Sequence, residues 1–219
     1  MTTVRRPLLL LGAAGLSREV IAAVRAQGDD GPYELLGALD DDPRRHGGDL
    51  DGVPVLGGTE LVHEHPDAAV VACVVSPRRR DARERLVARL DLPADRWGTV
   101  VHPTASVAAG TTLGEGTVLL AHTVVTAAQR VGAHVLAMPL VLLTHDDAVG
   151  DFVTLAGRAT LAGGVAVHDG AYLGSGCLVR EGLTIGAGAM IGMGSVVLRD
   201  VPPGETWAGV PARPLPPTD

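Results

Sequence analysis

The pair His145-Asp146 combines two side-chain types that proton transfer commonly uses. An imidazole gains and loses a proton near neutral pH, and a neighbouring carboxylate can fix its tautomer and raise its basicity. Such a pair can act as a general base that takes the proton from a hydroxyl or amino group while that group attacks an acyl carbon. The competing interpretation is a solvated histidine on an exposed turn.

A second candidate site combines a glycine turn with an acidic strand end. Gly12-Ala13-Ala14-Gly15 joins an expected strand at 7–11 to an expected helix at 16–27, so backbone N–H groups and the helix N-terminus can face an anion such as a diphosphate. Asp40 and Asp41 close the next expected strand, where a carboxylate commonly accepts hydrogen bonds from a ribose or a base. Because the turn lacks the full GxGxxG pattern, a plain tight turn beside a solvated acidic loop is the alternative.

The histidines and cysteines do not predict a metal centre within one chain. If the chain winds into coils of eighteen residues, as the six-residue repeat described below indicates, Ala127 and Gly163 lie next to His145 in the neighbouring coils. Neither of them is a metal ligand. A metal site shared between subunits stays open as an alternative. Cys73 and Cys177 lie in apolar runs without CxxC spacing, so we expect neither a disulfide nor a zinc knuckle, in keeping with a reducing cytoplasm.

Composition excludes several classes of partner. The chain has 219 residues, 46% of them hydrophobic, and a formal net charge of −7, the wrong sign for binding nucleic acid or coating an anionic membrane. The uncharged apolar run 135–144 is far shorter than the roughly 18 residues that a membrane-spanning helix needs. Arg5-Arg6 and the apolar residues after them could be an export signal, but strand, turn and helix are the better interpretation.

A six-residue repeat dominates the second half of the sequence. Every sixth position from Val101 to Val197 is a branched aliphatic residue except Ala137, without insertion. One unit holds a short strand and a bend, so three units close a triangular coil, and coils stack at about 4.8 Å. An amphipathic helix would need a period of 3.6 and less glycine. The sequence therefore predicts a parallel β-helix of nearly six coils, in which the glycine after many repeat positions, as at Gly114 and Gly132, relieves the bend.

The first hundred residues alternate strand and helix patterns instead. We expect a small, Rossmann-like parallel sheet with helices on its faces, from strands at 7–11, 33–39, 53–56 and 68–75 and helices at 16–27 and 78–90. The predicted fold class is thus α/β plus β. The predicted domains are a substrate-binding domain at 1–98, a β-helix domain at 99–203 and a C-terminal cap at 204–219.

The whole chain resembles the sugar O-/N-acyltransferases of the NeuD/PglD type. The resemblance is carried by the glycine turn 12–15, by Leu39-Asp40-Asp41, by the segment 144–152 (THDDAVGDF) and by 208–213 (AGVPAR). It implies a left-handed prism and an enzyme that moves an acetyl group from acetyl-coenzyme A to an amino or hydroxyl group of a sugar or nucleotide sugar, without a metal. It also implies a homotrimer with each active site between two prisms.

The resemblance assigns roles to single residues. His145 matches the family's base and Asp146 its acidic partner. The coenzyme channel would run along the prism edge and end at the C-terminal turn, where Arg213 could pair with a phosphate; the residues implied are Thr154, Gly163, Ser175, Met193, Gly209 and Arg213. The residues implied for the acceptor are Gly12, Ala14, Gly15, Leu16, Asp40 and Asp41. Thr154 and Leu16 stand where members often have histidines.

Two other functions are compatible with these patterns. A non-catalytic scaffold or sugar-nucleotide sensor could keep the prism without turnover, and a metal-dependent hydratase is a further alternative. The sequence leaves the acceptor open, together with the choice between N- and O-acetylation.

Overall fold

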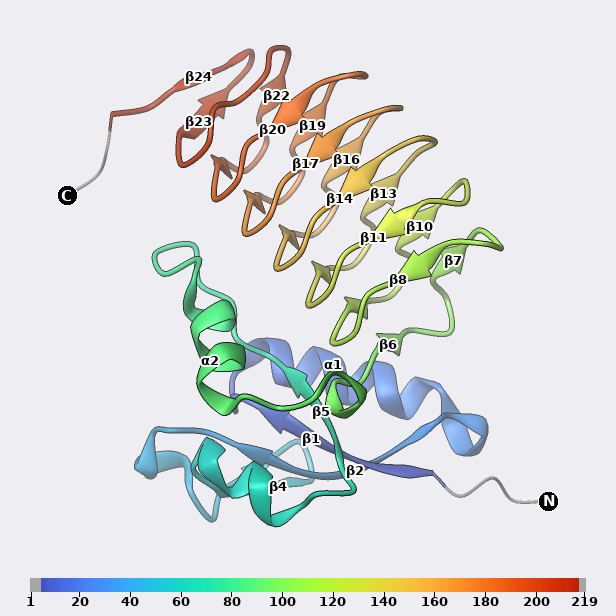
Figure 1. Cartoon of the computed structure of the whole chain (residues 1–219), viewed down its shortest axis with the longest axis vertical. Coiled ribbons are helices and arrows are strands. Elements are labelled where there is room, and N and C mark those ends of the chain that lie inside the picture. The colour runs from blue at the N-terminus through green and yellow to red at the C-terminus, as the bar shows by residue number, and fades with distance from the viewer. Residues whose placement is uncertain (1–4, 217–219) are drawn as a thin grey trace.

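A five-stranded sheet forms the N-terminal part of the chain, in the computed structural model that describes residues 5–216 (Figure 1). The strand order is β3-β4-β2-β1-β5, and all pairs are parallel except β3 with β4. The strands are β1 (Arg6–Leu11), β2 (Tyr33–Leu39), β3 (Asp49–Leu50), β4 (Val53–Gly57) and β5 (Ala69–Ala72). The helices are α1 (Gly15–Ala26) and α2 (Ala82–Leu90), with 3-10 turns at Gly28–Asp30, Pro43–Arg45, Thr59–Glu64 and Ala94–Arg96.

The two faces of this sheet bury different helices. Because side chains alternate along a strand, Leu8 and Leu10 of β1 pack with α1, whereas Leu9 and Leu11 pack with α2. Two expected boundaries were wrong. β5 ends at Ala72 instead of residue 75, because its partner β1 ends at Leu11, which pairs with Ala72. α2 begins at Ala82 instead of residue 78, because the four residues before it form turns.

The second half of the chain forms a three-sided prism of parallel strands, each two residues long except in the final hairpin (Figure 1). Sheet I contains β6 (Val100–Val101), β9 (Val118–Leu119), β12 (Leu136–Ala137), β15 (Thr154–Leu155), β18 (Tyr172–Leu173), β21 (Met190–Ile191), β23 (Thr206–Gly209) and β24 (Ala212–Pro214). Sheet II contains β7 (Ser106–Val107), β10 (Val124–Val125), β13 (Leu142–Leu143), β16 (Thr160–Leu161), β19 (Leu178–Val179) and β22 (Val196–Val197). Sheet III contains β8 (Thr112–Leu113), β11 (Arg130–Val131), β14 (Ala148–Val149), β17 (Ala166–Val167) and β20 (Thr184–Ile185).

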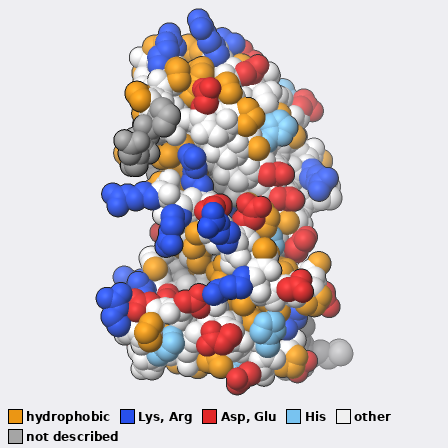
Figure 2. Space-filling view, turned by 60° about the vertical axis from the view of Figure 1, so that its left-hand side comes forward, with side chains coloured by type: hydrophobic (Ala, Val, Ile, Leu, Met, Phe, Trp, Pro, Cys, Tyr) orange, Lys and Arg blue, Asp and Glu red, His pale blue; other side chains and the backbone are white. Residues whose placement is uncertain are grey.

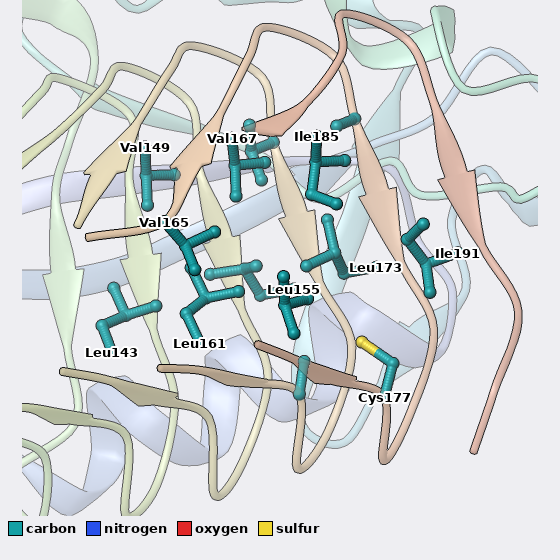
Figure 3. Close-up of a cluster of buried hydrophobic side chains, with 14 of the residues drawn as sticks. Leu143, Val149, Leu155, Leu161, Val165, Val167, Leu173, Cys177, Ile185 and Ile191 are labelled. Carbon is teal, nitrogen blue, oxygen red and sulfur yellow. The ribbon is translucent and has the colours of Figure 1, made fainter. Parts of the chain in front are cut away.

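The predicted six-residue repeat is confirmed strand by strand. The repeat residue is the second residue of every strand from β6 to β22, and from Leu119 onward these side chains are buried. Strands pair in register at eighteen residues, so Val125 lies beside Leu143 and Leu143 beside Leu161. Figure 3 shows the resulting stacks of aliphatic side chains inside the prism. The core can therefore do without large aromatic residues.

The glycines after repeat positions have a different role from the one predicted. A Cβ on Gly132 would lie 2.5 Å from the carbonyl carbon of Gly150 in the next coil, so glycine is needed there for close approach of two backbones. The bend, where the backbone is left-handed, lies two residues after the position that Gly132 occupies. Gly164 occupies it with φ +73°, and Asp146 occupies the equivalent place with φ +62°.

The sheet and the prism share one apolar core. α1 lies between them, and Val100, Val118 and Leu136 of sheet I point outward into the cluster that also contains Leu10 and Val20. The predicted boundary between two domains near residue 98 stays a prediction, because the two parts share this core. At the other end, β23 and β24 form an antiparallel hairpin beside β21, and residues 217–219 of the predicted cap lie outside the described chain. No helix between residues 5 and 216 is long and apolar enough to cross a membrane.

We expect Leu161→Ala to lower the free energy of unfolding by about 2–5 kcal/mol, because it empties space at a fully buried place in the stack. Thr160→Ala is the matched control, since its side chain points out of the same strand. Urea unfolding at fixed protein concentration measures both. Equal losses for the two variants would contradict the inward assignment of the repeat residue.

Candidate active site

His145 lies on an exposed turn at one edge of the prism. Residues 144–147, the His145 turn, connect β13 of sheet II to β14 of sheet III, at the II–III corner. His145 Nδ1 lies 2.8 Å from Asp146 Oδ2, and the two side chains are 70% and 84% exposed. With Nδ1–H donating to the carboxylate, Nε2 carries the free lone pair and can accept a proton. The pair therefore has the geometry of a general base and its acidic partner.

The imidazole lies against the backbone of the next coil. A Cβ on Gly163 would collide with the ring and lie 2.6 Å from Nε2, so only glycine leaves room for the ring at this place. The N–H of Gly164 donates to the carbonyl oxygen of His145 at 2.9 Å, which holds the turn at this height. Gly163, predicted as a coenzyme contact, thus lies directly beside the predicted base.

All six predicted acceptor residues line one cavity of about 510 Å³, which we call the glycine-turn cavity. It opens at the carboxyl ends of β1, β2 and β5, and its wall is completed by Thr59, Cys73, Val74, Val75, Arg79 and Leu86. Gly12 has φ +102°, a conformation that favours glycine. On the face shown in Figure 2, arginine side chains gather at mid-height beside acidic side chains.

The two aspartates of this cavity are also structural. Asp40 Oδ2 accepts the Ala13 N–H at 2.7 Å, which ties the acidic strand end to the glycine turn. Asp41 Oδ1 accepts from the N–H and the hydroxyl of Thr59, and its Oδ2 pairs with Arg89 at 2.6 Å. Partial burial raises the pKa of Asp41, but the hydrogen bonds from Thr59 and Arg89 outweigh it and lower that pKa overall. Asp41 is therefore ionised at neutral pH.

The predicted coenzyme residues do not share one edge, which corrects the expected channel. Gly163 lies at the II–III corner, whereas Ser175 and Met193 lie at the I–II corner between the first and second sheets. Thr154 is only 4% exposed, and its hydroxyl accepts a hydrogen bond from Arg83 at 3.1 Å. It therefore faces α2 and not a groove.

Ser175 lines an apolar cavity of about 570 Å³, the Ser175 cavity, between α1 and the I–II corner. The other lining residues are Glu19, Ala22, Ala23, His102, Leu120, Ala121, Met138, Pro139, Leu140, Gly157 and Arg158. Met193 lies further along the same corner and is 80% exposed. Gly209 and Arg213 belong to the hairpin of β23 and β24 beside sheet I.

These groups are therefore distributed over different edges of a single chain. The N-terminal part covers sheet I and its glycine-turn cavity lies on that side, whereas His145 projects from the corner opposite sheet I. The Ser175 cavity lies at a third place, the I–II corner. One chain alone does not bring the predicted base to either cavity.

Solved structures with this architecture include acetyltransferases. The acetyltransferase domain of PglB from Neisseria gonorrhoeae is 28% identical, with a TM-score of 0.83 over 96% of this chain and 100% of that chain. A histidine variant of perosamine N-acetyltransferase from Caulobacter crescentus, in complex with CoA and GDP-perosamine, is 28% identical, with a TM-score of 0.84 over 96% and 97%. WeeI from Acinetobacter baumannii is 29% identical, with a TM-score of 0.79 over 95% and 99%. Comparison with protein-family models and with curated proteins finds no match.

The chain is a hexapeptide-repeat sugar acyltransferase. The predicted left-handed β-helix with its N-terminal Rossmann-like sheet is confirmed, and so is the class of enzyme, an acetyl-CoA-dependent sugar acetyltransferase. Within residues 5–216 of the sugar acyltransferase, no group of three or more His, Cys, Asp or Glu side chains could hold a metal ion. The roles of single residues stay predictions.

Arg83 is a residue of the sugar acyltransferase that sequence reasoning missed. The residue is 3% exposed, and its guanidinium donates to the carbonyl oxygens of Val74 and Phe152, at 3.2 and 2.7 Å, in addition to the hydroxyl of Thr154. Burial lowers the pKa of Arg83 to about 10. Arg83 thus ties a wall of the glycine-turn cavity, at Val74, to the prism. A single arginine on an amphipathic helix gives no signal of such a contact.

His134 fills the same junction from the prism side. Its ring stacks on Phe152 with a centroid distance of 4.8 Å and meets Trp97 edge to face at 4.8 Å. Burial, and then the positive charge of Arg83, lower the pKa of His134 to about 4. The folded sugar acyltransferase therefore keeps this histidine neutral.

We expect the neutral state of His134 to make stability depend on pH. Because its pKa is about 4 in the folded state and 6.5 in the unfolded state, the unfolded chain binds the extra proton between these values. Stability should fall, by on the order of 2–3 kcal/mol, as the pH drops from about 6.5 towards 4. His134→Phe removes this pH-dependent loss of stability. The left-handed backbone at this place accepts phenylalanine, as Phe152 shows.

Urea unfolding at several pH values measures the effect as the difference between wild type and variant. The exposed residue His168 provides the control, since His168→Gln should leave the pH dependence unchanged. Parallel curves for wild type and His134→Phe would contradict the assignment.

Proposed function

We propose that this enzyme acetylates the amino group of a nucleotide-linked amino sugar, with His145 as the general base. The observation that carries the proposal is the exposed His145-Asp146 pair, whose free Nε2 lies beside the Gly163 backbone. The amine nitrogen forms a bond to the acetyl carbonyl carbon while its proton passes to Nε2. The bond from that carbon to sulfur then breaks, and the departing coenzyme A thiolate takes the proton from the imidazolium. The Gly163 N–H, beside the ring, is available to stabilise the oxyanion between these steps.

The glycine-turn cavity supports a nucleotide-linked acceptor. The N-terminus of α1 at Gly15 has no acidic residue in its first turn, and a helix N-terminus of this kind favours a diphosphate. Asp40 keeps lone pairs for a ribose or base beyond the bonds that it accepts within the turn. The perosamine N-acetyltransferase structures hold GDP-perosamine, an amino sugar on a nucleoside diphosphate, which favours an amino group as the site of acetylation.

The Ser175 cavity supports binding of acetyl-CoA. Its lining is mainly apolar, as suits the long pantetheine arm, and Ser175 itself can offer a hydrogen bond. Met193, further along the same corner, and Arg213 near the end of the prism extend this surface. The Arg213 guanidinium suits a phosphate of the coenzyme.

A homotrimer is the assembly that completes the site. The outward side chains of sheet II include Val124, Leu142, Leu178 and Val196, an apolar face that the N-terminal part leaves uncovered. Packing sheet II of neighbouring copies together brings the II–III corner of one copy, which carries His145, towards the I–II corner of the next, which carries the Ser175 cavity. Each active site then needs two chains.

Two further assignments belong to the proposal. The free and buried thiols of Cys73 and Cys177 suit a reducing compartment, which favours the cytoplasm. The functional division follows the predicted boundaries, with acceptor binding in residues 1–98, acetyl transfer in 99–203 and a coenzyme-contacting cap after them.

We expect His145→Ala to lower kcat by about 10²–10⁴-fold in an acetyl transfer assay with nucleotide-linked amino sugars, because the amine then lacks its base. Binding of acetyl-CoA, followed by thermal shift, should persist. His168→Ala, an exposed histidine at another corner, is the matched control. Near wild-type turnover by His145→Ala would refute the assigned base.

We expect two inactive variants to restore activity when they are co-expressed. Ala14→Trp blocks the glycine-turn cavity and keeps the base, whereas His145→Ala keeps the cavity and lacks the base. Mixed trimers contain some sites with both groups intact if those groups come from different chains. Activity of co-purified mixed trimers, and the molecular mass by light scattering, test this. No recovery in verified mixed trimers would show that both groups act within one chain.

A further inference from the structure

A buried carboxylate lies directly beneath the His145 turn. Asp147 is 4% exposed, whereas its neighbours His145 and Asp146 point into solvent. Its carboxylate forms no ion pair within 4 Å among the described residues. Burial raises the pKa of Asp147, against the hydrogen bonds from Val165 and Thr144 that lower it. Burying a carboxylate is costly, so this residue calls for a reason.

Asp147 holds the His145 turn through both carboxylate oxygens. Oδ2 accepts the Thr144 N–H at 2.8 Å, which closes the turn around His145 and Asp146. Oδ1 accepts the Val165 N–H at 2.9 Å, which binds the turn to the next coil just after Gly163 and Gly164. The two sides that frame the imidazole, its own turn and the glycine backbone beneath it, are therefore joined through one side chain.

The fold itself does not require a carboxylate at this place. The equivalent position at the same corner is Val165 in the next coil and Leu183 in the one after, and both are buried and apolar. The two coils before it carry Thr111 and Gln129 at the equivalent place, which are polar but uncharged. Gln129, one coil earlier, accepts the Asp147 N–H at 3.0 Å through Oε1. Among these equivalent places, the charged side chain thus coincides with the coil that carries the histidine.

We propose that Asp147 is a positioning residue for acetyl transfer, which keeps the His145 imidazole above the Gly163 backbone; this rests on the proposed role of His145. The backbone of the turn includes Asp146 at φ +62°, which a non-glycine residue adopts at a cost. The two hydrogen bonds to the Asp147 carboxylate offset this cost and leave one geometry for the ring. Without these two hydrogen bonds the imidazole is still present, but it is aligned with Gly163 for only part of the time.

The test is Asp147→Val, which places in this coil the residue that the next coil carries. We expect kcat to fall about 10–100-fold with KM for acetyl-CoA and acceptor changed less than about twofold, since the variant removes alignment and not binding. Asp147→Asn keeps one acceptor oxygen and should recover part of kcat. Thr111→Val, at the equivalent place near the first coils, is the matched control and should keep full kcat.

A second measurement does not depend on turnover. The imidazole NMR signal of His145, assigned by its loss in His145→Ala, should broaden or split in Asp147→Val and recover in Asp147→Asn. If Asp147→Val keeps wild-type kcat and an unchanged His145 signal, the positioning role is wrong. Failure of the proposed function looks different, because His145→Ala would then be active whatever the state of the turn.

Discussion

In-register stacking of eighteen-residue coils is the constraint on which this structure depends. Because strands of successive coils pair without any shift, each side chain has fixed neighbours eighteen positions away. The same register that places Leu143 on Leu161 inside the prism places the His145 ring on Gly163 outside it. One inserted residue between them would send the aliphatic stack outward and the His145 turn inward. Core packing and the geometry of the proposed base are thus one property of the chain.

A prism also fixes which groups can never meet within one chain. Its rigid edges separate the II–III corner from the I–II corner, and the N-terminal sheet covers only sheet I. Flexible loops, which often gather catalytic groups in other folds, are absent from the prism between residues 100 and 201, where every corner is short. A scaffold with little freedom to bend can gain a composite site most simply from a second copy, which is the arrangement of the proposed homotrimer.

The sequence predicted what depends on periodicity and failed where two distant parts meet. The repeat predicted the prism, the outward direction of His145 and the neighbouring Gly163. The glycine turn, the acidic strand end and the family resemblance together predicted six acceptor residues, and the structure brings all six to one cavity. The contact of Arg83 with Thr154 could not be predicted, since both residues are ordinary within their own elements and meet only through the docking of α2 on the prism. The shift of the α2 start to Ala82 reflects local turns after Pro77.

Buried Arg, His and Asp side chains lie where separate parts of this enzyme are held together. Of the four buried Arg, His and Asp side chains within residues 5–216, Arg96 holds the sheet together through carbonyl oxygens, while Arg83 and His134 lie where sheet meets prism. Of these four, only Asp147 lies in the prism away from the N-terminal part. In the next two coils the same corner holds the buried aliphatic residues Val165 and Leu183, so packing alone does not explain the carboxylate. A group that costs free energy to bury, and that reaches both sides of the imidazole, is understandable where a single ring orientation matters more than stability.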